Sequence, residues 1–134
     1  YSFVHLLGVA GRHTREMHEV PVAVVSDGPR RWLVAQVPTS AWVANVRASG
    51  QGTLTRGKVY EEVSLTEVSD RARAADVIGR YRLMTAGMTK RHFPSENDLE
   101  EAGRHPVFAL NPLDADIAAE TPSVGRTASS GESS

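Results

Sequence analysis

The sequence has no cysteine, few aromatic residues (6%) and no long apolar run. Without cysteine, a disulfide framework, a cysteine-ligated zinc site and a thiolate nucleophile are excluded. Apolar stretches such as residues 22–25 are far shorter than the roughly 20 residues that a membrane-spanning helix needs. A Gly-x-Ser-x-Gly elbow, a phosphate-binding loop and a dinucleotide fingerprint are also missing, and with them the usual motifs of hydrolases, kinases and nicotinamide enzymes. Catalysis would therefore depend on a bound cofactor, a histidine, a carboxylate or a hydroxyl.

The histidines do not have the spacing of a metal site. No two of them lie four residues apart, and no carboxylates cluster beside them in the sequence. We therefore expect no metal ion. The five residues are His5, His13, His18, His92 and His105.

Length and charge favour one domain followed by a polar tail. The chain has 134 residues, of which 40% are hydrophobic, and a net charge of −1. Residues 113–134 are mostly small and polar and contain four acids and one arginine, a net −3 that leaves +2 for residues 1–112. We expect residues 1–112 to form the folded domain and residues 113–134 to be a disordered tail. A charge of +2 is too small for duplex DNA and suits a small anionic ligand, so no nucleic acid partner is expected.

The apolar pattern predicts six strands with short helical inserts. Strands are expected at residues 3–10, 18–26, 31–37, 53–56, 58–66 and 106–110. Short turns join most of them, including one at residues 27–29 in which Gly28 supplies a positive φ. A doubly wound parallel sheet needs a crossover helix after nearly every strand, so this pattern predicts a small antiparallel barrel, mainly β with short helices.

Three helices are expected, at residues 41–48, 71–85 and 96–102. Ser40 is the expected N-cap of the first helix, and Ser95 with Asp98 resembles a capping box at the start of the third. The second helix has a period near 3.6 residues. This period predicts that Ala72, Ala75, Ile78 (or Gly79) and Leu83 face the core and that Arg71, Arg73, Arg80 and Arg82 face outward.

The best local evidence for a binding site is the turn at residues 11–18, which carries Arg12, His13, Thr14, Arg15 and His18. Two arginines, two histidines and a hydroxyl in one turn are the composition of a phosphate or carboxylate site. The alternative is an ordinary solvated hairpin turn, since such turns are often charged. A turn held between two strands at a barrel mouth favours the binding interpretation.

Other polar and aromatic residues have two readings each. Trp42 and Asn45 are three residues apart and share a helix face, although in isolation Trp42 is better explained as a core anchor and Asn45 as an exposed cap-like residue. Tyr60, Tyr81 and His92 are candidate proton donors, and each could instead be a packed aromatic or a surface residue.

Several stretches also follow one another in the order of a known family. They are Gly11-Arg12-His13-Thr14-Arg15 leading to Val20-Pro21-Val22, Asp27-Gly28, Trp32-Leu33-Val34-Ala35-Gln36, Trp42-Val43-Ala44-Asn45-Val46-Arg47-Ala48 and Pro106-Val107-Phe108-Ala109-Leu110. Over about residues 3–111 the chain resembles the deazaflavin (F420)-dependent nitroreductases, split β-barrel oxidoreductases related to the pyridoxamine-phosphate-oxidase-like flavin proteins. Where that family has lysine, serine and a second glycine in the turn, this chain has His13, Thr14 and Arg15.

The resemblance implies a cofactor and a reaction. It implies that coenzyme F420 is bound, its anionic groups by Arg12, His13, Thr14 and Arg15 and its ring by Pro21, Val22, Ala35 and Gln36, with His18, Trp42 and Asn45 as further cofactor-binding candidates. The implied reaction is hydride transfer from the reduced deazaflavin to an electron-poor small molecule such as a quinone, an enone or a nitro compound. No dedicated catalytic side chain is required, because the protein holds the reacting planes together and excludes water.

Two alternatives stay open at this point. One is an enzyme with flavin mononucleotide (FMN) on the same barrel, which would use the turn at residues 12–15 for one phosphate. The other is a non-catalytic barrel that binds an apolar or lipid-like ligand. We expect a cytoplasmic protein with no integral membrane span, and leave open both a homodimer and a peripheral association with the membrane.

Overall fold

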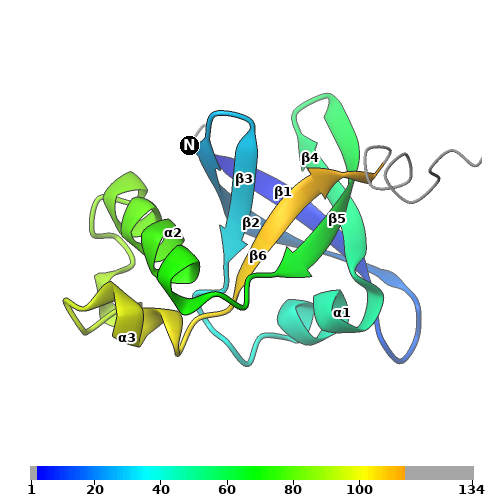
Figure 1. The fold of residues 1–134 in the computed structure, drawn as a ribbon. Coiled ribbons are helices and arrows are strands. Elements are labelled where there is room, and N and C mark those ends of the chain that lie inside the picture. The colour runs from blue at the N-terminus through cyan, green and yellow to red at the C-terminus, as the bar shows by residue number, and fades with distance from the viewer. Residues whose placement is uncertain (1–2, 114–134) are drawn as a thin grey trace, which may run out of the picture.

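A computed structural model describes residues 3–113, which form a closed antiparallel β-barrel with short helices (Figure 1). The barrel order is β1-β2-β3-β6-β5-β4, and β1 pairs with β4 to close the ring. The predicted mainly-β barrel is therefore confirmed. Its strands are β1 (Val4–Ala10), β2 (Met17–Asp27), β3 (Arg30–Val34), β4 (Gln51–Arg56), β5 (Val59–Glu67) and β6 (Val107–Pro112).

The helices occupy two of the connections between strands. Helix α1 (Ala41–Ser49) links β3 to β4 and lies at one end of the barrel (Figure 1). Helix α2 (Arg71–Met84), the 3-10 turn η1 (Lys90–His92) and helix α3 (Asp98–Ala102) all lie between β5 and β6. No helix within residues 3–113 is long and apolar enough to cross a membrane.

Strand β2 changes partners along its length. Its residues from Met17 to Ala23 pair with β1, and those from Val24 to Asp27 pair with β3. In the described part of the chain, no strand pairs with the second edge of β2 between Met17 and Ala23. The chain leaves the sheet after Val34, so the barrel is open beside this edge.

Two apolar cores hold the fold together. The first fills the barrel and is closed at one end by Val43 and Val46 of α1, which pack with Leu7, Leu33 and Phe108. The second lies outside the barrel, where Val77, Ile78 and Tyr81 of α2 cover the outer face of β2, β3 and β6. Because successive strand residues point to opposite faces, Leu33 enters the first core and its neighbour Trp32 the second.

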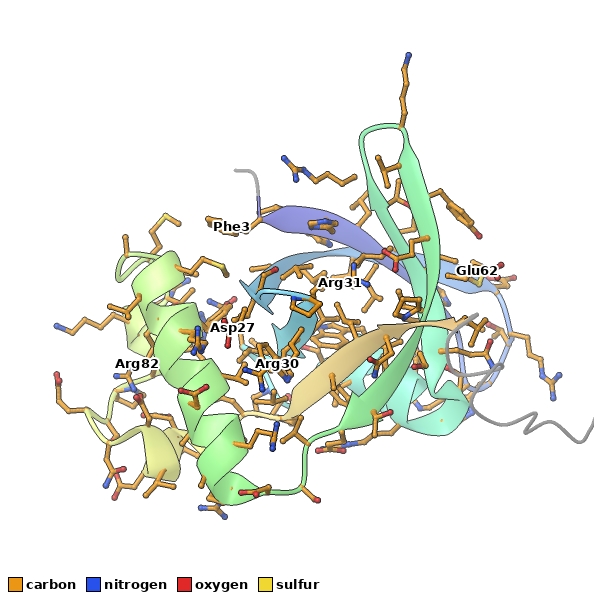
Figure 2. The ribbon with its side chains drawn as sticks, turned by 45° about the horizontal axis from the view of Figure 1, so that its top comes forward. Phe3, Asp27, Arg30, Arg31, Glu62 and Arg82 are labelled. Atoms are coloured by element: carbon orange, nitrogen blue, oxygen red, sulfur yellow. The ribbon has the colours of Figure 1, made fainter. Side chains whose placement is uncertain are left out.

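Polar contacts cap α2 and tie it to the barrel. The Asp70 side chain accepts hydrogen bonds from the backbone N–H groups of Ala72 and Arg73 and caps the N-terminus. Farther along, Arg80 lies 3.3 Å from Asp27, which also pairs with Arg30 at 2.7 Å (Figure 2 labels Asp27 and Arg30). The β2–β3 turn is thus tied to α2, and Gly28 in that turn has the predicted positive φ, 62°.

Several sequence-based boundaries need correction. The third strand ends at Val34 rather than at residue 37, and the last one continues to Pro112. Helix α3 begins at Asp98, where the Asn97 side chain caps it, rather than at residue 96 with Ser95 as the cap. Ser40 stands at the N-cap position of α1, but its hydroxyl donates to the Val37 carbonyl and makes no cap bond.

The inward face of α2 also differs from the prediction. Its buried residues are Ala74, Ala75, Val77, Ile78 and Tyr81, whereas Ala72 is exposed and Leu83 is 84% exposed. Leu83 is two positions beyond Tyr81, about 200° around the helix, so the two residues cannot share a face. Arg82 was predicted to face outward, but it reaches into the loop after α2 and donates to the carbonyls of Phe93 and Ser95.

Residues 114–134 lie outside the described part of the chain, so the predicted tail stays a prediction.

Candidate functional site

A cavity of about 840 Å³ lies beside the unpaired edge of β2. Its lining comes from the β1–β2 turn, β2, α1 and the C-terminal end of α2 with the loop that follows. From His18 to Ala23 the cavity follows β2 over six residues, which is about 17 Å of extended chain. A planar polycyclic ligand with a side chain fits these dimensions.

We call Arg12, His13, Thr14 and His18 the turn wall of the cavity. This wall is held in place by Asn45 on α1. The Asn45 side chain is buried, and its Oδ1 accepts hydrogen bonds from the Arg12 backbone N–H at 3.0 Å and from Arg12 Nη1 at 2.9 Å. Two bonds to one oxygen fix both the backbone and the guanidinium of Arg12. The remaining guanidinium N–H groups can therefore donate to an anionic ligand group from a preset position.

Close packing shapes the rest of the turn. Gly11 is buried beneath the turn, and a Cβ at this position would lie 3.0 Å from His18 Nε2 and 3.1 Å from Thr14 Oγ1. Glycine therefore lets the backbone approach both side chains closely. At the other end of the turn Arg15 has a φ of 67°, the left-handed conformation that glycine adopts more easily. The family that the sequence resembles has glycine at this position. The backbone here adopts a conformation that suits glycine, although the residue is arginine.

The middle of the cavity is the unpaired edge of β2. Val20, Pro21, Val22 and Ala23 line it, and their second edge has no strand partner within residues 3–113. An unpaired strand edge presents backbone N–H and C=O groups in a row, except at Pro21, which has no N–H. The edge can therefore hydrogen-bond the polar rim of a flat heterocycle while the valine side chains contact its face.

We call Tyr81, Thr85, Met88 and Thr89 the helix wall. The Thr85 hydroxyl lies 3.0 Å from the Tyr81 carbonyl and 3.0 Å from the Thr89 hydroxyl, so the two threonines hold the loop after α2 against the helix end. Burial raises the pKa of Tyr81, which keeps its phenol protonated at neutral pH. The phenol is therefore neutral and can donate a hydrogen bond at this wall.

The structure brings together most of the residues singled out in the sequence. Arg12, His13, Thr14, His18, Pro21, Val22, Gln36, Trp42, Asn45 and Tyr81 all line the cavity. Four others lie elsewhere. Ala35 is fully buried in the barrel core, Arg15 is exposed outside the cavity, Tyr60 is 63% exposed on β5, and His92 is in η1.

Sequence reasoning missed much of the helix wall. Thr85, Met88 and Thr89 belong to a loop that carries no recognised motif, and it reaches the cavity only because α2 packs across β2 and β3. The one local sign is Ala86-Gly87, where the chain reverses with positive φ values of 51° and 81°. A turn there could be predicted from Gly87, but its position beside β2 could not.

The sequence matches no protein-family model, and no curated protein sequence matches it. Solved structures do match its fold. A structure described as a reductase dependent on reduced F420 (FDR-A) has a TM-score of 0.60 and 16% identity, over 81% of this chain and 94% of that one. A Listeria innocua protein described as a proposed pyridoxamine 5′-phosphate oxidase has a TM-score of 0.59 and 9% identity, over 82% of this chain and 83% of that one.

A third structure, described as a domain-swapped dimer, has a TM-score of 0.56 and 17% identity, over 81% of this chain and 80% of that one. At these identities the comparisons concern the fold. The chain has the split β-barrel fold that these structures share, and the resemblance to a deazaflavin-dependent nitroreductase-like barrel is confirmed at that level.

Proposed function

We propose that the protein is an oxidoreductase that binds the deazaflavin coenzyme F420 in the cavity beside β2 and passes hydride to an electron-poor small molecule. The observation that carries this proposal is a cavity lined together by the cationic turn wall, the unpaired edge of β2 and the hydroxyl-bearing helix wall. The fold it shares with an F420-dependent reductase supports the choice of cofactor.

The residues present fit such a cofactor. Arg12 is preset by Asn45, and His13, Thr14 and His18 add donors around it, so the turn wall suits phosphate and carboxylate groups. The edge of β2 at Pro21 and Val22 suits the ring, with Gln36 and Trp42 on the facing side of the cavity. When bound, reduced F420 supplies the hydride. The protein holds the ring and the acceptor in contact and excludes water between them.

Tyr81 is the proposed proton donor to the reduced acceptor, because it is the one of the three candidate donors that lines the cavity. Burial raises the pKa of its phenol, which is therefore protonated at neutral pH. An acceptor such as a quinone or a nitro compound gains negative charge as hydride arrives, and a donor at hydrogen-bond distance stabilises it. The other two donor candidates, Tyr60 and His92, do not line the cavity.

A second cofactor has one specific observation in its favour. Arg12 is the one arginine among the cavity-lining residues, because Arg15 points away from the cavity. A single arginine is sufficient for the single phosphate of FMN, whereas the longer anionic side chain of F420 would use the histidines as well. FMN is therefore the second candidate cofactor on the same site.

The test is a fluorescence titration of the protein with F420 and, beside it, with FMN. We expect F420 to bind, and Arg12→Ala to weaken binding about tenfold or more, because a charge-assisted contact to phosphate is worth about 1.5–3 kcal/mol. Arg15→Ala is the matched control in the same turn and should change the affinity less than about twofold. Tighter binding of FMN than of F420 would make the second candidate the cofactor.

Equal loss of F420 affinity in the two arginine variants would contradict the assignment of the turn wall. Binding of neither cofactor would contradict an oxidoreductase and favour a barrel for apolar ligands. If F420 binds, Tyr81→Phe should slow reoxidation of the reduced coenzyme by a quinone without weakening coenzyme binding. A homodimer and a cytoplasmic location stay predictions.

A further inference from the structure

A buried acid and a buried histidine form a pair behind the cavity. Glu101 on α3 is 0% exposed, and its Oε1 lies 3.4 Å from Nε2 of His105, which is 5% exposed. Its Oε2 accepts from the Ser95 N–H at 2.6 Å and from Arg104 at 3.2 Å, whereas Oε1 accepts no hydrogen bond in the described structure. A buried carboxylate oxygen is costly without a donor, so the His105 contact needs a proton.

The other ring nitrogen of His105 determines where that proton is. Nδ1 lies 2.9 Å from the carbonyl oxygen of Ala35, and a carbonyl only accepts, so Nδ1 must carry a hydrogen. Nε2 and Oε1 would then face each other with lone pairs unless one further proton lies between them. The pair holds that proton either as imidazolium with carboxylate or as neutral imidazole with a protonated Glu101. In both forms the pair is neutral overall.

His105 in turn contacts Ala35 and Phe93, which adjoin residues that line the cavity. Ala35 stands between Val34 and Gln36, which line the cavity, and its N–H donates to the Pro106 carbonyl at 2.8 Å. Both polar groups of the Ala35 backbone are therefore held by residues 105 and 106. The His105 ring also stacks on Phe93 with centroids 4.0 Å apart, and Phe93 packs on Tyr81 of the helix wall at 5.6 Å.

We propose that Glu101 and His105 form a clamp that positions residues 34–37 and Tyr81 at the cavity, and that ligand affinity falls when the His105 donor to the Ala35 carbonyl is removed. His105 is in this sense a positioning residue, because it acts through Ala35 and Phe93 and does not line the cavity itself. The clamp relies on the proposed function only for the choice of F420 as one of the two probes.

Neighbouring charged groups hold the clamp in place. Arg104 contacts Glu101 Oε2, and Arg82 lies over the ring of Phe93, 5.7 Å from its centroid. Arg82 also pairs with Asp98, and Glu100 accepts a hydrogen bond from the Ser95 hydroxyl.

The first experiment needs no ligand. Long-range proton–nitrogen NMR of the full chain at pH 7 should show His105 with a protonated Nδ1, as the bond to the Ala35 carbonyl requires. An unprotonated Nδ1 at pH 7 would overturn the clamp, because the bond to the Ala35 carbonyl could not then exist.

The second experiment measures cavity affinity at pH 7 with anilinonaphthalene sulfonate and with F420 as separate probes. We expect His105→Phe, which retains the ring stack and removes the donor to Ala35, to weaken both probes about tenfold, the effect of one lost hydrogen bond. Glu100→Gln, on the same helix as Glu101, is the matched control and should leave both affinities unchanged.

Unchanged affinity for both probes in His105→Phe would overturn the proposal. Hydrogen exchange at the Ala35 amide, which donates to the Pro106 carbonyl, should also rise about tenfold in this variant, and unchanged exchange would overturn the clamp. Failure of F420 alone to bind would count against the proposed function and leave the clamp standing.

Discussion

The two walls of the cavity are built in opposite ways. The turn wall comes almost entirely from residues 12–18, and its side chains are exposed apart from the Arg12 contact to Asn45. The helix wall is backed by a buried stack of Tyr81, Phe93 and His105, contributed by three separate segments between β5 and β6. The turn wall provides charged and hydrogen-bonding groups, and the helix wall provides a packed surface.

This difference separates binding chemistry from stability. Exposed donors can change with little effect on folding, because water replaces their lost partners. Buried aromatic residues cannot change without a loss of stability, because removing one leaves a cavity in a close-packed core. We therefore expect substitutions in the turn wall to affect ligand affinity first, and those behind the helix wall to affect stability first.

Phe93→Ala should give the largest loss of stability among the substitutions that test this expectation. Phe93 is 1% exposed between Tyr81 and His105, and removing its ring leaves a cavity that the stack cannot close. We expect a loss of about 3–5 kcal/mol in the free energy of unfolding, measured by urea denaturation.

The matched control is Leu83→Ala on α2. Leu83 is 84% exposed, so its removal should change the free energy of unfolding by less than about 0.5 kcal/mol. A loss above about 2 kcal/mol at Leu83 would show that its side chain is buried in solution, as the sequence-based prediction had it, and that the orientation of α2 is wrong.

Phe93 and Leu83 also show what could be predicted from the sequence and what could not. The helix at residues 71–85 was predictable from its length and its capping residue Asp70. Its buried face was not, because the choice of Val77 over Leu83 depends on how α2 crosses β2 and β3, which no local pattern records. For the same reason the Phe93–His105 stack had no signal in the sequence.

The turn wall could be predicted better, because its residues are adjacent in the chain. The concentration of arginine, histidine and threonine at residues 12–18 pointed to the right segment without any knowledge of the fold. The sequence could not show that Arg12 faces the cavity and Arg15 does not, because this depends on the bond from Arg12 to Asn45, 33 residues away.

Asn45→Ala should break that bond. The side chain is 5% exposed and accepts from both the backbone and the guanidinium of Arg12. We expect a loss of about 1–2 kcal/mol in stability, since the Arg12 groups then turn to water. A double-mutant cycle with Arg12→Ala should show coupling, and additive losses would mean that the two side chains do not interact in solution.

Glu61→Gln tests a charged pair that belongs to neither wall. Arg31 donates to both oxygens of Glu61, at 2.9 and 2.7 Å, and this contact lowers the pKa of Glu61 below its ordinary value of 4.5 (Figure 2 labels Arg31). A lowered pKa stabilises the fold above pH 4.5, and the contribution disappears as the pH falls through the value in the folded protein.

We therefore expect Glu61→Gln to cost about 0.5–1 kcal/mol at pH 7 and almost nothing in acid, because both side chains are partly solvated. Unfolding curves at several pH values measure the difference. Glu62→Gln is the control, since Glu62 is exposed on the neighbouring position and forms none of the ion pairs within residues 3–113. A difference that grows toward low pH would contradict the assigned sign.

Arg15→Gly should have the smallest effect and the opposite sign. Arg15 holds a φ of 67° without an ion pair in the described structure, so it bears the strain of a left-handed residue and gains little in return. Glycine removes that strain but adds freedom to the unfolded chain, which leaves a net gain of about 0.5 kcal/mol. Arg12→Gly in the same turn should instead destabilise, because Arg12 has no positive φ and is bonded to Asn45. Opposite signs for two arginines three residues apart would show that the cationic wall rests on Arg12, and that the backbone at residue 15 keeps a shape suited to glycine.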